Sequence, residues 1–204
     1  MKSQLSIVEK RAISSKKLQN RLDLNKKLGS KDLTSWLFKR YQIKKNDIIL
    51  ELGCGIGDHV IKEEKIVGTK GFIVATNYSV NSLKKLKKKN KSKNVLVKCI
   101  AMDDISNFLK KKKIRFDKII SSYALYYASN PIKVIKDCSK FLKKNGHFLI
   151  TAPCYPHTLT EFALSKGTLP KIAKKYIDFS KMKLEKFLKS SKTFSKSYNF
   201  RNIL

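Results

Sequence analysis

The residues best able to do chemistry lie in one short stretch, in which a glutamate precedes three glycines at alternate positions: Glu51-Leu52-Gly53-Cys54-Gly55-Ile56-Gly57. The apolar run at 48–52 predicts a short buried strand of a parallel sheet. Glycine permits positive φ angles and a close approach of the backbone to a ligand. A helical pattern follows from Asp58, and the first turn of a helix offers N–H groups to an anion. The stretch predicts a turn that holds a nucleotide-like ligand.

The glycine spacing separates two nucleotide-binding families. The dinucleotide fingerprint G-x-G-x-x-G would need a third glycine where Asp58 stands, which disfavours a nicotinamide dehydrogenase. The observed E-x-G-x-G-x-G resembles the first motif of class I S-adenosylmethionine-dependent methyltransferases. This resemblance implies that Glu51 lies near the amino group of the cofactor's methionine moiety, and that the turn lines the cofactor through Gly53, Cys54, Gly55 and Gly57. The alternative is a tight turn without a ligand.

A second polar group follows the apolar run at 71–76, which predicts the next strand. The resemblance places here an acid that binds the ribose hydroxyls, but this chain has Asn77. An amide oxygen still accepts a hydrogen bond, without the charge assistance of a carboxylate. Tyr78 stands where the family packs an apolar side chain on the adenine.

A third candidate group follows the predicted strand at 95–101 and consists of Met102 and two acids, Asp103 and Asp104. The resemblance implies that an acid here bonds the adenine amino group. Asp103 fits this role best and Asp104 is the alternative. Either aspartate could instead cap a helix.

The predicted strand at 116–122 leads into an aromatic loop. The resemblance implies that Ser121 contacts the cofactor and that the loop contributes to the methyl-acceptor pocket through Tyr123, Tyr126 and Tyr127. We expect at least one of these tyrosines to be core. His157 lies on the predicted ligand side, where a surface loop role competes with acceptor binding. Methyl transfer from a sulfonium is an in-line displacement that depends mainly on positioning, and no catalytic base is assigned.

These groups all follow predicted strands, and the strands alternate with helices. A fifth strand is expected at 147–151, and helices at 58–67, at 80–89 behind a Ser79 cap, and from Pro131 to Lys143 with Gly146 as a left-handed cap. Such alternation predicts an α/β fold with a doubly wound, mostly parallel, Rossmann-like sheet. Ligands of these sheets bind at the carboxyl ends of the strands, where all the groups above converge.

The chain divides into three predicted parts: a helical cap at 1–45, a cofactor-binding core at 46–153 and a helical acceptor-side segment at 154–204. Residues 33–41 carry apolar side chains at helical spacing in the cap. The resemblance covers 43–153, and the family's last two strands are not evident beyond it. We therefore expect the sequence to be truncated relative to full-length relatives.

The composition restricts the function classes further. The 204 residues carry a net charge of +31, but lysine dominates the 46 basic residues and is spread along the chain. This spread favours a compositional bias over nucleic-acid binding, for which arginine is preferred. The four cysteines form no C-x-x-C pair, and neither a long apolar run nor a signal sequence is evident, so we expect a cytoplasmic protein without a metal site.

Three functions remain from the sequence. The first is transfer of a methyl group from S-adenosyl-L-methionine to a small-molecule acceptor. The second is RNA methylation, with lysines along the phosphates. The third is a degenerate, non-catalytic module, suggested by Asn77. The acceptor, its reacting atom and the oligomeric state stay open.

Overall fold

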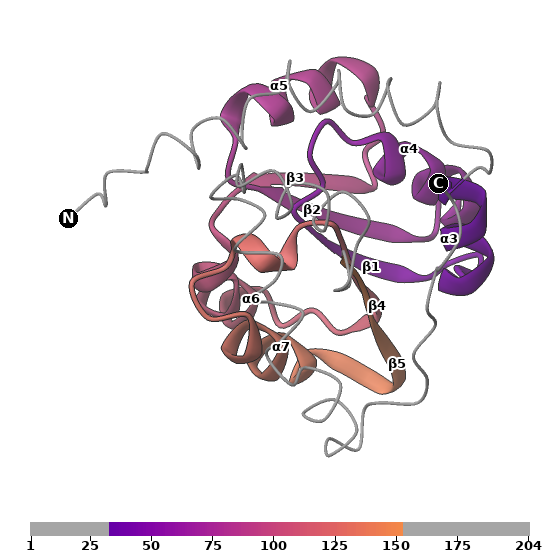
Figure 1. The fold of residues 1–204 in the computed structure, drawn as a ribbon. Helices are drawn as coiled ribbons and strands as arrows, with labels where there is room; N and C mark the ends of the chain where they lie inside the picture. Colours follow the sequence, from indigo (N-terminus) through magenta and orange to yellow (C-terminus); the bar gives the residue numbers. More distant parts are fainter. Residues whose placement is uncertain (1–32, 153–204) are drawn as a thin grey trace, which may run out of the picture.

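The computed structural model describes residues 33–152, and these form one parallel sheet with helices on both faces (Figure 1). The sheet has the strand order β3-β2-β1-β4-β5. All pairings are parallel. The strands are β1 (Ile48–Leu52), β2 (Phe72–Asn77), β3 (Val95–Cys99), β4 (Phe116–Ser122) and β5 (Leu142–Thr151). The order reverses at β1, which lies between β2 and β4, so the predicted doubly wound sheet is confirmed.

The helices divide between the two faces of the sheet. Figure 1 shows α3 (Leu33–Tyr41), α4 (Asp58–Val67) and α5 (Val80–Lys89) on one side, and α6 (Ile105–Lys112) and α7 (Pro131–Ser139) on the other. Two short 3-10 turns, η1 (Met102–Asp104) and η2 (Leu125–Tyr127), follow β3 and β4. Each helix that connects two parallel strands thus covers one face of the sheet.

Each face has its own hydrophobic core, and β1 contributes to both because its side chains alternate. Leu50 and Leu52 pack with α6 and α7, whereas Ile49 packs with α3, α4 and α5. Glu51 shares the strand face of Ile49 and therefore points toward α3 and α4. This alternation places an acid inside an apolar layer.

Local signals in the sequence set several element ends as predicted. Gly68, with φ 68°, ends α4 and its N–H donates to the Glu64 carbonyl. The Ser79 hydroxyl accepts the N–H of Ser82 and caps α5. Pro131 occupies the first turn of α7. Ser79 and Pro131 thus mark where two loops of the carboxyl edge end, whereas Gly68 ends α4 at the opposite edge of the sheet.

The segment before β5 differs from the prediction. Helix α7 ends at Ser139 rather than Lys143, and the strand begins at Leu142. Gly146 is not among the residues with positive φ, so its assignment as a left-handed cap was wrong. A Cβ there would lie 2.7 Å from the Phe116 carbonyl oxygen, so glycine is needed for close approach to β4. Residues 143–146 form an irregularity in the β4–β5 register.

The remaining sequence predictions concern other parts of the chain. The first part of the helical cap, the segment 154–204 and His157 lie outside the described residues, so the three-part division stays a prediction. Among residues 33–152, no helix is long and apolar enough to cross a membrane.

Candidate functional site

The carboxyl edge of the sheet gathers the polar and aromatic residues singled out in the sequence. Glu51 and Asn77 stand at or next to the ends of β1 and β2, and Ser121 at the end of β4. Among the described residues, three of the four exposed large apolar side chains also follow β2 or β4: Tyr78 at 47%, Val80 at 54% and Tyr123 at 40% exposure. Exposed apolar side chains gathered at one edge are a mark of a binding surface.

The glycine turn after β1 has the backbone that its composition predicts. Gly53, Gly55 and Gly57 have φ angles of 77°, 55° and 86°. The N–H groups of Gly53 and Cys54 both donate to the Thr76 carbonyl oxygen at 2.9 Å, which ties the turn to β2. The turn is therefore held in place by hydrogen bonds as well as by its φ angles.

Two of these glycines are also required by packing. A Cβ on Gly53 would lie 2.4 Å from the Ala124 Cβ and 2.7 Å from the Met102 Cε. A Cβ on Gly57 would lie 2.2 Å from the Leu86 Cδ1. The close approach expected for a ligand is, at these two positions, an approach to other side chains of the protein. The Gly53 contact joins the turn to the loops after β3 and β4.

Glu51 is a buried acid without a donor at this edge. Its side chain is 2% exposed, and its Oε2 has no hydrogen-bond partner among the described residues. Burial, followed by the nearby Glu63, raises the pKa of the Glu51 carboxyl well above its ordinary value. A buried carboxyl lacking a donor fits a cationic group such as an ammonium, which supplies both charge and N–H donors.

Glu63 was not recognised in the sequence. It lies on α4, is fully buried, and neither of its carboxyl oxygens has a hydrogen-bond partner in the described part of the chain. Burial raises its pKa to about 7. Its spacing from the buried Val60 and Val67 is the signal that could have found it, since an acid stands where the inward stripe of the helix requires an apolar residue.

Tyr41 is a second residue that sequence patterns left as a packing residue. Its hydroxyl hydrogen-bonds the Ser122 hydroxyl and lies 3.2 Å from the Thr151 Oγ1. Burial and the nearby Glu51 raise its pKa, so the phenol is neutral. Tyr41 thus connects α3 to the carboxyl ends of β4 and β5. The preceding residue is Arg40, and its guanidinium lies 3.5 Å from the centroid of the Trp36 ring one turn earlier on α3.

His59 lies in the first turn of α4, directly after the glycine turn, and packs against α3. Its ring meets Phe38 edge-on at 5.4 Å between centroids and Tyr41 at 6.4 Å. Burial, with a smaller effect of Lys62, lowers its pKa to about 4, so the imidazole is neutral at pH 7. The Cys54 thiol is also buried, and burial raises its pKa. Neither residue supplies positive charge to the acids.

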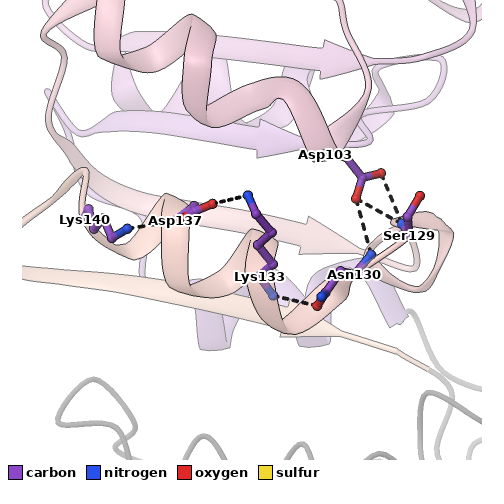
Figure 2. A network of polar contacts seen from close by, with 6 residues as sticks. All are labelled: Asp103, Ser129, Asn130, Lys133, Asp137 and Lys140. Carbon is purple, nitrogen blue, oxygen red and sulfur yellow. Dashed lines mark hydrogen bonds and ion pairs between the residues drawn. The ribbon is translucent and has the colours of Figure 1, made fainter. Parts of the chain in front are cut away.

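Asp103 forms a structural link across the edge (Figure 2). Both of its carboxylate oxygens lie 3.1 Å from the Ser129 amide nitrogen, and its Oδ1 lies 3.3 Å from that of Asn130. The Asn130 side chain in turn caps α7 by accepting the Lys133 N–H. Asp103 therefore fastens η1 to the two residues that directly precede α7. The neighbouring Asp104 is exposed and has no side-chain cap bond to α6.

The residues expected after β4 separate into buried and accessible groups. Ser121 is fully buried, and its hydroxyl donates to the Leu52 carbonyl oxygen at 3.3 Å. Tyr126 is 6% exposed and belongs to the core, as expected of at least one of the three tyrosines. Its ring lies 4.6 Å from that of the half-buried Tyr127. Tyr123 combines 40% exposure with a positive φ of 51°, a conformation that is costly for a bulky residue.

Residues 43–198, more than half of the sequence, match a family model described as a methyltransferase domain. The chain belongs to this methyltransferase family. The resemblance inferred from the glycine motif is thereby confirmed. The class I fold of the family and its cofactor S-adenosyl-L-methionine are those predicted from the sequence.

The methyltransferase is similar to a curated protein and to several solved structures. It is 29% identical over 102 residues to the ubiquinone/menaquinone biosynthesis C-methyltransferase UbiE of Wigglesworthia glossinidia brevipalpis. The match covers 50% of this chain and 41% of that relative, so the matched region spans about two fifths of the relative's length.

Two solved structures share the fold. One is the putative methyltransferase in complex with the Trm112 activator of Haloferax volcanii, with 17% identity, 65% and 57% coverage of this chain and of that chain, and a TM-score of 0.53. The other is a putative sarcosine dimethylglycine methyltransferase from Galdieria sulphuraria, with 21% identity, 57% and 44% coverage, and a TM-score of 0.50.

Proposed function

We propose that this methyltransferase binds S-adenosyl-L-methionine at the carboxyl edge of β1, β2 and β3 and transfers the methyl group to a small-molecule acceptor. The observation that carries this proposal is the buried Glu51 carboxyl, whose Oε2 has no donor in the described part of the chain. The α-ammonium of the cofactor supplies the charge and the N–H donors that Glu51 lacks.

The other roles follow the strand ends along the edge. Asn77 accepts a hydrogen bond from a ribose hydroxyl through its amide oxygen, and the exposed Tyr78 covers the adenine together with Met102. Asp104 bonds the adenine amino group more readily than Asp103, because Asp103 already accepts two backbone N–H groups. The remaining cofactor-binding positions act through their backbone or by shaping the edge: Gly53, Cys54, Gly55, Gly57 and Ser121.

The chemistry requires little from the protein beyond positioning. The bound cofactor supplies a methyl group on a sulfonium, which is already a good electrophile. The protein holds the acceptor in line at about 3–3.5 Å and excludes water, which lowers the barrier through proximity. Tyr123 and Tyr127 are the proposed acceptor contacts because they line the loop after β4, whereas Tyr126 supports them from the core. His157 stays a proposed acceptor residue.

The names of relatives support a small-molecule acceptor. One is a ubiquinone/menaquinone biosynthesis C-methyltransferase, and another is a putative sarcosine dimethylglycine methyltransferase. Their acceptors are small molecules of different kinds. They do not select the acceptor atom for this chain.

A second candidate function, RNA methylation, is favoured by the lysines that end two helices. Lys87–Lys89 close α5, and Lys110–Lys112 close α6. RNA binding by these lysines would weaken steeply as salt rises, because counterions are released. A gel-shift titration with single-stranded RNA at two salt concentrations tests this alternative, and absence of salt-sensitive binding excludes it.

Isothermal titration of the purified chain with S-adenosyl-L-methionine, and separately with NADH, tests the proposed function. We expect micromolar binding of the first ligand alone, and a loss of at least tenfold in Glu51→Gln, which removes the charge. Glu64→Gln is the matched control, at a half-buried glutamate of α4 whose Oε1 accepts the Ser92 hydroxyl. Absence of binding at millimolar cofactor in the folded wild type would instead indicate a degenerate module.

A further inference from the structure

We infer that Glu63 is a positioning residue of the cofactor site and acts through Glu51: in the cofactor-free protein the two carboxyls share a proton, which the ammonium of the cofactor displaces. This inference rests on the proposed function and deepens it. Glu63 does not touch the cofactor. Glu63 instead sets the protonation state of the Glu51 carboxyl that the cofactor encounters.

The geometry of two facing elements carries this inference. Glu51 points from β1 toward α4, and Glu63 points from α4 toward the sheet, with 2% and 0% exposure. The Glu51 Oε2 and both oxygens of Glu63 have no hydrogen-bond partner among residues 33–152, and the two carboxyls are near enough that Glu63 raises the pKa of Glu51. Two adjacent carboxyls in a dry site do not both ionise. A proton on one of them gives the other the donor that the surroundings lack.

The other titratable groups around the pair do not replace this proton. Tyr41 faces the pair from α3 and Cys54 from the glycine turn, and the pKa of each is raised, so both are neutral. His59, one turn earlier on α4, is neutral because burial lowers its pKa to about 4. Lys62 lies on the same helix, and its Nζ lies over the Phe38 ring at 5.8 Å. No described cation pairs with the acids, so the shared proton is their only compensation.

The proton balance defines the expected behaviour. Before binding, the Glu51 carboxyl donates its O–H to Glu63. On binding, that O–H bond breaks, the proton leaves to solvent, and the ammonium N–H groups donate to the carboxylate. Because burial, and then the nearby Glu63, raise the pKa of the Glu51 carboxyl well above its ordinary value, the release of this proton becomes easier as the pH rises. Cofactor affinity should therefore rise with pH, at most about tenfold per pH unit for one released proton.

The experiment is isothermal titration of the full chain with S-adenosyl-L-methionine between about pH 6 and pH 7.5, a range that includes the raised pKa of Glu63. Each titration is repeated in two buffers of different ionisation enthalpy, which counts the released protons. The variant Glu63→Gln keeps the volume but donates an amide N–H to Glu51. Glu64→Gln is the control on the same helix. Methylthioadenosine, which lacks the amino acid part of the cofactor, controls for the adenosine contacts.

We expect the affinity of the wild type to rise several-fold across this range with proton release, and that of Glu63→Gln to stay flat. Glu64→Gln should follow the wild type, and methylthioadenosine should bind independently of pH. The ligand's own ionisation is common to all variants and cancels in the comparison.

Equal pH slopes in the wild type and Glu63→Gln would overturn the role of Glu63 while leaving the cofactor site intact. Cofactor binding to the wild type without proton release would also overturn the role of Glu63. This measurement uses the wild type alone, so it does not depend on whether a variant folds. A folded wild type that binds no cofactor at any pH would instead overturn the proposed function, and this inference with it.

Discussion

The carboxyl edge has two halves, which hold their functional groups differently. The glycine half, formed by the β1 turn, β2 and α4, keeps its acids buried and uses glycine at each position of positive φ within the turn. The tyrosine half, formed by the loops after β3 and β4, places the bulky Tyr123 at positive φ and leaves it 40% exposed. In the proposed function, the first half binds the cofactor and the second contacts the acceptor.

The two halves meet at one tight contact, which allows the comparison to be tested. Gly53 belongs to the glycine half and Ala124 to the tyrosine half, with space for no atom between them. Disturbing this contact should affect both halves, whereas changes deeper in either half should affect that half alone. The predictions below follow this logic from the largest expected effect to the smallest.

Gly53→Ala should produce the largest effect. Its Cβ would lie 2.4 Å from the Ala124 Cβ at a φ of 77°. Positive φ costs about 1–2 kcal/mol for alanine and overpacking about 1–3 kcal/mol more, so the free energy of unfolding should fall by about 2–5 kcal/mol. Urea denaturation measures this loss. Adding Ala124→Gly should recover the overpacking part, and a double variant no more stable than the single one would refute the contact.

Glu63→Gln should change the pH dependence of stability in the glycine half. The folded pKa of about 7 exceeds the ordinary value of 4.5, so the folded chain holds a proton that the unfolded chain releases. The contribution of Glu63 to stability is therefore full below about pH 4.5 and is lost as pH rises through about 7. As the pH rises across that window, the free energy of unfolding of the variant should increase relative to that of the wild type by up to about 3 kcal/mol.

Thermal and urea unfolding of both proteins at matched pH values measure this difference. Subtracting one curve from the other removes the titration of all groups that the two proteins share. Glu64→Gln should track the wild type. A variant-minus-wild-type difference that does not change with pH would rule out the buried proton.

Tyr41→Phe should have an intermediate effect, because it removes one hydroxyl that joins α3 to the ends of β4 and β5. Loss of a buried hydrogen bond typically costs about 1–2 kcal/mol. Denaturant titration measures the change, with Tyr78→Phe as the exposed control that should lose almost nothing. Equal losses in the two variants would show that the Tyr41 hydroxyl contributes no stability.

Asp103→Asn should have the smallest effect on the cofactor. Its carboxylate is engaged by the N–H groups of Ser129 and Asn130, so the adenine contact falls to Asp104. We expect Asp104→Asn to weaken cofactor binding several-fold more than Asp103→Asn, while Asp103→Asn lowers the melting temperature more. Calorimetry of both variants decides this, and the reverse order of affinities would assign the adenine to Asp103.

The sequence predicted several helix ends correctly because the signals there are local. Gly68, Ser79 and Pro131 act on the backbone within a turn of their own positions, so their effects can be inferred without knowing the fold. The parallel, doubly wound sheet followed from the alternation of helices and strands. The residues at the carboxyl edge were identified for the same reason.

The misjudged residues depend on partners far along the chain. Gly146 looked like a helix cap, but the Phe116 carbonyl, which is distant in sequence, requires it to lack a Cβ. The roles of Glu63 and Tyr41 depend on Glu51 and on the strand-end hydroxyls, which only the folded chain brings together. Periodicity placed Tyr41 on the inward-facing stripe of its helix, and the spacing of Glu63 from Val60 and Val67 could have done the same for Glu63. It could not show that they meet polar groups there.

The stacked Trp36 and Arg40 on α3 have a practical consequence. Trp36 is the single tryptophan of the sequence, so the intrinsic fluorescence of the protein above the tyrosine band comes from one indole. Tyr41, on the same helix, is fixed to the ends of β4 and β5. The emission of this indole therefore serves as a built-in optical probe of the helix that covers the buried acids, with no label to attach.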